Sequence, residues 1–180
     1  HGQLDTGDQV TRVATSKDGI NFDVKKAILG PPYFRVFEHE NWIYALCWGG
    51  EIWRSKDWCS PFEKGPKILP FDISEKHLPS FRHGEIFLRN SVLHIFFSNI
   101  NEKPEAILHT KMDISNDWMD WKISSIQKIL EPALIWEGSD LPVLISVVGA
   151  ASGRLRELRD PCVFQDVDGK VYLLYSAAGE

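Results

Sequence analysis

The sequence predicts an all-β protein in which four-stranded antiparallel units follow one another along the chain. Two observations carry this prediction: short apolar runs alternate with turn-forming residues, and the same order of four runs recurs. Apolar residues at the helical spacing of three and four occur only weakly, around residues 114–119. Four short strands repeated in this way are typical of the blades of a β-propeller.

The first complete unit is expected over residues 33–69. A turn near Glu40 and Asn41 separates its first strand from its second, which covers residues 42–48. This second strand is apolar on both alternating faces, which indicates a central strand buried between two layers. The remaining strands of the unit are expected over residues 33–37, 51–57 and 62–69.

A second unit is expected over residues 83–130, with a turn at residues 89–91 after its first strand. Its strands are expected over residues 83–88, 92–98, 106–111 and 121–130. In both units Ser or Thr and then Asp lie near the end of the third strand. Their side chains bond their own backbone in tight turns, so we expect the outer hairpin there.

The two ends of the chain match incomplete units of one domain, residues 1–180. Residues 9–29 match the third and fourth strands, an outer half blade, and residues 158–180 match the first and second strands, an inner half blade. Residues 131–157 form a long insertion between the second unit and the inner half blade. The sum is about three blades, fewer than the four or more of a closed propeller. The chain is therefore either part of a longer protein or a head-to-tail homo-oligomer in which half blades pair between chains.

Composition argues against several kinds of partner and site. The net charge of −5 disfavours nucleic acid or an anionic membrane surface as a partner. No apolar run approaches the roughly 18 residues that cross a bilayer, and no signal peptide is recognised, so we expect a soluble domain and leave its compartment open. The three cysteines and six histidines lack metal-binding spacing, so we expect no cofactor, no required metal and no disulfide framework. Cys47 and Cys162 lie in apolar strands and are expected to be buried.

The best-preserved half blade begins with Arg159, Asp160 and Pro161 and continues as two apolar strands joined by an Asp-Gly turn. With the strand pattern, this motif resembles the five-bladed β-propeller glycosidases, which include arabinanases, β-xylosidases, levanases and invertases. Residues 158–180 are also similar to uncharacterised bacterial glycosidase-like propeller proteins. The resemblance implies a central funnel lined by the first strands of successive blades. It also implies three carboxylates there: a base or nucleophile, a general acid, and a third that orients the others or holds the sugar.

Asp160 matches the third carboxylate of this resemblance, because it lies where the Arg-Asp-Pro turn enters a first strand. Its alternative role is to shape that turn, as Asp before Pro often does. Arg159 would hold a sugar hydroxyl or keep the carboxylate ionised, or else is a surface cation. Aligning the first strands places His83 and Tyr33 at positions equivalent to Asp160, which makes both candidates for sugar binding.

Further candidates surround these positions. Arg82 and His83 are either a sugar-binding pair or a structural pair. Glu85 lies two residues beyond His83, on the same face of the strand, and is an acid–base candidate. A carboxylate in an apolar strand needs a partner when it is not functional, and Arg35 is either that partner or a ligand contact.

The insertion supplies two more candidates. Glu137 is the other plausible general acid, and Asp140 is a nearby sugar-binding candidate. The alternative is that both are solvated loop residues. His94 and His109 lie within strands and are expected to be hydrogen-bonded sheet residues rather than ligands.

These observations predict a glycosidase-like propeller that binds or hydrolyses a carbohydrate at its funnel. The alternative is a non-catalytic module that binds sugar or assembles with itself. Hydrolysis requires two carboxyl groups about 5–10 Å apart, one to donate a proton and one to support attack at the anomeric carbon. A funnel that holds Asp160 alone favours binding or a structural role.

Overall fold

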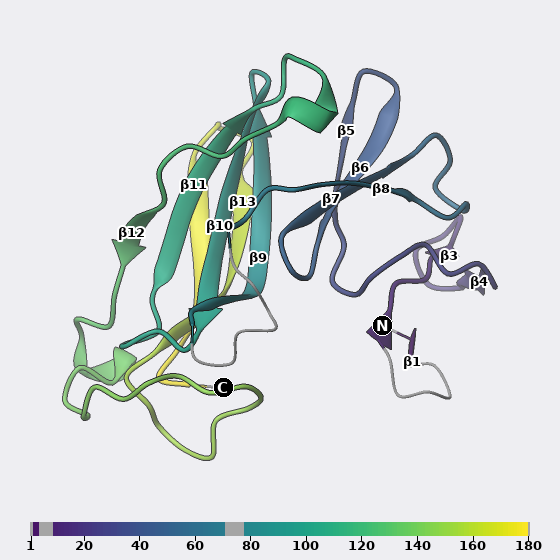
Figure 1. Cartoon of the computed structure of the whole chain (residues 1–180). Coiled ribbons are helices and arrows are strands. Elements are labelled where there is room, and N and C mark those ends of the chain that lie inside the picture. The colour runs from purple at the N-terminus through teal and green to yellow at the C-terminus, as the bar shows by residue number, and fades with distance from the viewer. Residues whose placement is uncertain (1, 4–8, 71–77, 180) are drawn as a thin grey trace.

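The computed structural model describes residues 2–3, 9–70 and 78–179, and in this part of the chain two four-stranded antiparallel sheets dominate (Figure 1). The first sheet has the order β5 (Arg35–His39), β6 (Trp42–Cys47), β7 (Glu51–Ser55), β8 (Glu63–Lys67). The second has the order β9 (Ser80–Arg89), β10 (Val92–Ile100), β11 (Ile107–Asp113), β12 (Gln127–Leu130). Each strand pairs with its neighbour in sequence, which is the meander of a propeller blade.

Shorter strand pairs lie on either side of these sheets. They are β1 (Gly2–Gln3) with β2 (Gln9–Val10), β3 (Ala14–Thr15) with β4 (Asp23–Val24), and β13 (Leu158–Gln165) with β14 (Val171–Ala177). Figure 1 shows β3 and β4 beyond the first sheet, while β13 lies against the second. The predicted fold class, an all-β chain built from propeller-type blades, is confirmed. Residue 180, the last of the predicted inner half blade, lies outside the described residues.

Two-residue turns close the first hairpin of each sheet. Glu40 and Asn41 have φ of 47° and 61°, and Asn90 and Ser91 have φ of 49° and 58°. Two successive residues in the left-handed region match the twist of the flanking strands. These turns fix the register in which β5 pairs with β6 and β9 with β10.

The main core lies between the two four-stranded sheets. Residues 43–47 of β6 are all buried, as expected for a strand covered on both faces. One apolar cluster joins side chains of both sheets, including Phe37, Tyr44, Leu46, Ile52, Leu93, Ile95, Phe97, Met112 and Trp118. At its rim the Arg54 guanidinium carbon is 3.9 Å from the ring centroids of both Trp42 and Trp118. This cation–π sandwich links the two blades.

The helical content is limited to short 3-10 turns in the part of the chain that the structure describes. The weak helical pattern at residues 114–119 leads into η1 (Trp118–Asp120), whose first turn is capped by Asp117, which accepts from the Met119 N–H at 2.9 Å. The insertion holds η2 (Ile135–Glu137) and, over residues 131–157, no strand. None of the described helices has the length and apolar character needed to cross a membrane.

One prediction about the cysteines is wrong. Cys47 is buried, but Cys162 is exposed on β13, and all three cysteines are free. Cys162 pairs across the hairpin with Leu174 and shares its face with Phe164, and all three side chains face outward. The apolar pattern identified a strand correctly, but no described sheet covers this face.

Candidate functional site

The entrances of three successive first strands meet at one place. Tyr33 precedes β5, His83 lies in β9 and Asp160 lies in β13. The rings of Tyr33 and His83 have centroids 4.7 Å apart, and His83 Nδ1 lies 2.5 Å from Asp160 Oδ1. The three positions that align as equivalent in the sequence are therefore adjacent in space. All three residues are partly exposed.

The backbone turns sharply at two of these positions. Tyr33 has φ of 64° and Asp160 has φ of 47°, a region that few residues other than glycine adopt. The β13–β14 register also shifts between Arg159 and Cys162, so Asp160 lies in an irregular part of the ladder. Such irregularities redirect a side chain out of the regular alternation of a strand. Asp160 therefore both shapes the turn and points at His83.

The contact with His83 favours the ionised form of Asp160. The hydrogen bond from His83 lowers the pKa of the Asp160 carboxyl below its usual value, and the charges of His83, Arg82 and Arg159 act in the same direction. Partial burial opposes them without cancelling the effect. Asp160 is thus an ionised hydrogen-bond acceptor at neutral pH.

Glu85 and Arg35 form a second polar contact between β5 and β9. Arg35 Nε lies 3.5 Å from Glu85 Oε2 and donates to the Gly84 carbonyl at 2.8 Å. Arg35 is thus the partner for Glu85 that the sequence suggested. Both side chains keep part of their surface open to solvent.

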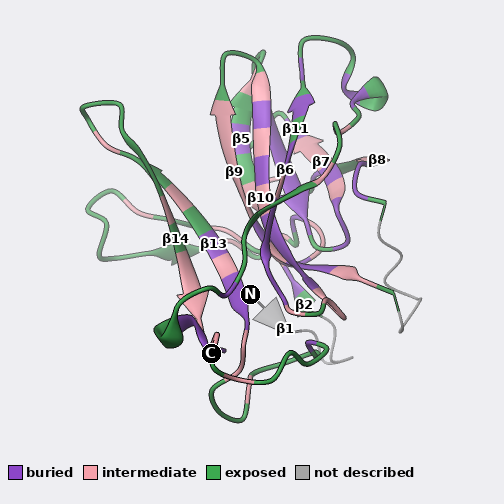
Figure 2. Ribbon diagram, turned by 90° about the vertical axis from the view of Figure 1, so that its left-hand side faces the viewer, coloured by how far each residue is buried: buried purple, intermediate pink, exposed green. Residues whose placement is uncertain are grey.

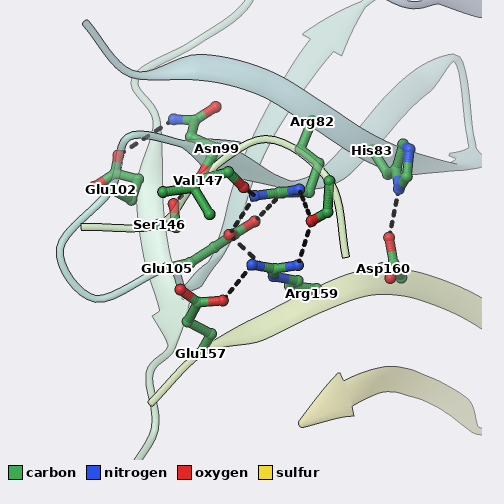
Figure 3. Close-up of polar contacts among 11 residues, drawn as sticks. Arg82, His83, Asn99, Glu102, Glu105, Ser146, Val147, Glu157, Arg159 and Asp160 are labelled. Atoms are coloured by element: carbon green, nitrogen blue, oxygen red, sulfur yellow. Dashed lines mark hydrogen bonds and ion pairs between the residues drawn. The ribbon is translucent and has the colours of Figure 1, made fainter. Parts of the chain in front are cut away.

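Arg82 and Arg159 take a different position from the one expected. Arg159 is fully buried and Arg82 is 5% exposed, and both are engaged with carboxylates beside the His83–Asp160 pair (Figure 3). A direct sugar contact does not fit the burial of either guanidinium group. The alternative of Arg159 as a surface cation is wrong for the same reason.

The partners of these arginines, Glu105 and Glu157, were not singled out in the sequence. Glu105 precedes β11 and Glu157 immediately precedes β13, outside any recognised motif. A signal was nevertheless present, because an arginine within an apolar strand requires a buried anion. The sequence could not say which of 25 acidic residues would supply it.

Glu137 is a structural residue of the insertion. It is 5% exposed, accepts from the N–H groups of Ala133 and Leu134 at 2.8 and 2.9 Å, and accepts from the Tyr175 hydroxyl at 2.7 Å. Burial raises the pKa of Glu137, but these three hydrogen bonds outweigh it and the net pKa is lowered. The alternative of a solvated loop residue is wrong for Glu137. Asp140, in contrast, is an exposed loop residue 3.4 Å from Arg154.

The strand histidines His94 and His109 lie against each other, with His94 Nδ1 3.1 Å from His109 Nε2. Burial lowers the pKa of both imidazoles, and the positive charge of Lys111 lowers both further. The described residues contain no group of three or more His, Cys, Asp or Glu side chains placed to hold a metal ion.

No protein-family model matches the chain. The chain is 34% identical over 180 aligned positions to the uncharacterised protein R118 of Acanthamoeba polyphaga mimivirus, an alignment that covers 95% of this chain and 50% of that protein. The chain thus spans about half the length of this relative.

Two solved structures with a partial likeness of fold are glycoside hydrolases. A thermostable family-43 glycoside hydrolase has a TM-score of 0.47 at 16% identity, with 79% of this chain and 40% of that chain covered. An exo-1,5-alpha-L-arabinanase from a bovine ruminal metagenomic library has a TM-score of 0.47 at 14% identity, with 78% and 44% covered.

Proposed function

We propose that the chain binds a carbohydrate at the surface formed by Tyr33, His83 and Asp160. The observation that carries this proposal is the meeting of these three side chains from the entrances of three first strands. An aromatic ring, an imidazole and an ionised carboxylate lie in contact there, and each is partly exposed. Ligand sites typically combine an apolar or aromatic surface with a few placed polar groups in this way.

The chemistry of the three groups suits a neutral polyhydroxylated ligand. Sugar hydroxyls donate hydrogen bonds, and the ionised Asp160 is an acceptor only. The Tyr33 ring offers an apolar face beside a polar edge. Glu85 adds a second acceptor on the same face of β9, about 6.6 Å along the strand from His83. The carboxylates and the net charge of −5 disfavour a polyanionic ligand.

The site favours binding over hydrolysis. Glycoside hydrolysis needs one carboxyl group that is protonated at working pH and a second that acts as base or nucleophile. The pKa values of Asp160 and Glu137 are both lowered, so neither carboxyl is suited to donate a proton. Glu85 is paired with Arg35. Non-catalytic recognition is the function that this arrangement supports best.

Calorimetric titration with neutral arabino-, xylo- and fructo-oligosaccharides tests the proposal. We expect at least one to bind, and Asp160→Asn to weaken it about tenfold or more, because a hydrogen bond to a charged group contributes about 1.5–3 kcal/mol. Asp140→Asn is the matched control and should leave the affinity unchanged. Binding to none of these sugars, or equal binding by Asp160→Asn, would contradict the proposal. Release of reducing sugar by the wild type would show that the site hydrolyses its ligand.

A further inference from the structure

The His83–Asp160 contact depends on the relative position of two strands that do not pair. β9 belongs to the second four-stranded sheet and β13 pairs with β14, so no backbone ladder joins them. We infer that Glu105 is the positioning residue that holds β9 and β13 in the alignment that brings His83 against Asp160. The consequence for ligand binding rests on the proposed function, whereas the structural inference does not.

Glu105 contacts both strands with one carboxylate. Arg82 Nε of β9 donates to Glu105 Oε1 at 2.7 Å, and Arg82 Nη2 donates to Oε2 at 3.1 Å. Arg159 Nε of β13 lies 3.2 Å from the same Oε2. Glu105 is fully buried, so the two guanidinium groups take the place of its solvent. Its backbone carbonyl also accepts from the Leu158 N–H of β13 at 3.0 Å.

A second bridge runs beside the first. The Gly149 carbonyl accepts from Arg159 Nη1 at 3.2 Å and from Arg82 Nη1 at 3.5 Å. Arg82 Nη2 also donates to the Val147 carbonyl, and Arg159 Nη2 pairs with Glu157 (Figure 3). Two arginines and two glutamates balance in charge. The guanidinium groups of Arg82 on β9 and Arg159 on β13 thus share two acceptors, the Glu105 carboxylate and the Gly149 carbonyl.

The position of this cluster in the sequence links it to the site. Arg82 immediately precedes His83, and Arg159 immediately precedes Asp160. Figure 3 shows the Arg82–Glu105–Arg159 cluster beside the His83–Asp160 pair. Arg82 and His83 come from β9, and Arg159 and Asp160 come from β13. A slip of β13 along β9 would break the cluster and separate His83 from Asp160 together. Buried ion pairs add little net stability, and in some proteins they specify one arrangement, which is the role inferred for Glu105.

The test is the pKa of Asp160 in the Glu105→Gln variant, followed by carboxyl NMR and assigned by the signal lost in Asp160→Asn. Glutamine keeps the size of Glu105 and removes its charge. Without any movement, removing an anion beside Arg82 and Arg159 would lower the pKa of Asp160. Loss of the alignment weakens the hydrogen bond from His83 and raises that pKa. We expect a rise of about one pH unit, and Glu63→Gln, which removes the charge from the surface pair with Arg54, should cause none.

A folded Glu105→Gln protein whose Asp160 pKa is unchanged or lowered would overturn the inference. If this variant does not fold, Arg82→Lys gives the same test, because it keeps the charge and loses the two-pronged contact with Glu105. A raised Asp160 pKa is expected there too, and an unchanged value overturns the inference. Neither measurement involves a sugar. A raised Asp160 pKa in a variant of a protein that binds no oligosaccharide would therefore support the positioning role of Glu105. It would contradict only the proposed function.

Discussion

Asp160 combines a left-handed backbone with an ionised side chain bonded to His83. The Arg-Asp-Pro motif pointed to this residue, and the alignment of first strands pointed to its neighbours. The same motif led to a wrong position for Arg159, which is buried rather than at the ligand surface. Neighbouring residues of a strand point to opposite faces of the sheet. The sequence could not tell which of the two faces would be covered.

His83→Ala should raise the pKa of Asp160, since the hydrogen bond from His83 is the main cause of its lowered value. A group whose pKa is depressed in the folded state stabilises the fold above its unfolded pKa, about 3.9 for Asp. This contribution is lost as pH falls through the folded-state pKa. Denaturant unfolding should therefore show a variant that is less stable than wild type at pH 6, with the difference shrinking on acidification. A difference that grows at low pH would contradict the assignment.

Glu137→Ala should destabilise the protein by about 1–3 kcal/mol, because the backbone N–H groups of Ala133 and Leu134 and the Tyr175 hydroxyl all lose their acceptor. Asp140→Ala, three residues away on the surface, should change stability by less than about 0.5 kcal/mol. Urea unfolding of both variants measures the difference. Equal stabilities would mean that Glu137 does not anchor the insertion.

The arrangement of the two blades depends on the packing between their sheets. Trp118 of η1 packs against Gly65 of β8, where an added Cβ would lie 2.1 Å from the Trp118 ring. Gly65→Ala should therefore displace Trp118 and destabilise the protein by about 1–3 kcal/mol. Gly153→Ala is the control, since nothing lies within 4 Å of its added Cβ. Thermal unfolding compares the two, and a Gly65→Ala midpoint equal to that of the control would contradict the packing.

Sequence patterns predicted the strands and turns better than the long-range contacts of their side chains. The turns after the first strands followed from the residues near Glu40 and Asn41 and at 89–91, since local turn chemistry is encoded locally. The second sheet begins at Ser80, three residues before the predicted start of the unit at His83. The buried position of Glu137 was not predicted, because one of its hydrogen-bond partners, the Tyr175 hydroxyl, lies 38 residues away in the sequence.

At the scale of the whole molecule, β14 differs from its counterparts β6 and β10. Most residues of β6 and β10 are buried, whereas β14 carries only intermediate and exposed residues (Figure 2). Tyr172 and Leu174 of β14 are 39% and 55% exposed. They border a hollow of about 660 Å³ together with Trp136 and Phe164. In the described part of the chain β14 pairs with β13 alone, so one edge of this apolar hairpin is open.

We propose that a second copy of the chain covers this edge with its β3–β4 hairpin, in the head-to-tail assembly that is one of the two alternatives left open by the sequence. β3 and β4 pair only with each other among the described strands. Phe22, just before β4, and Val24, within β4, are 59% and 67% exposed. Light scattering with size exclusion should show a dimer for wild type and a monomer for Leu174→Lys, because a charge on the covered face opposes association. A monomeric wild type would contradict this assembly and leave the alternative of a longer protein.

Tyr33, His83 and Asp160 are proposed to form one ligand-binding surface. Aromatic ¹H–¹³C NMR during titration with a binding oligosaccharide tests it most directly. The ring signals of Tyr33 and His83 should shift with saturation, while those of His94 and His109, which contact each other in β10 and β11, should not. A saturable titration that moves other rings and leaves Tyr33 and His83 unchanged would contradict the claim.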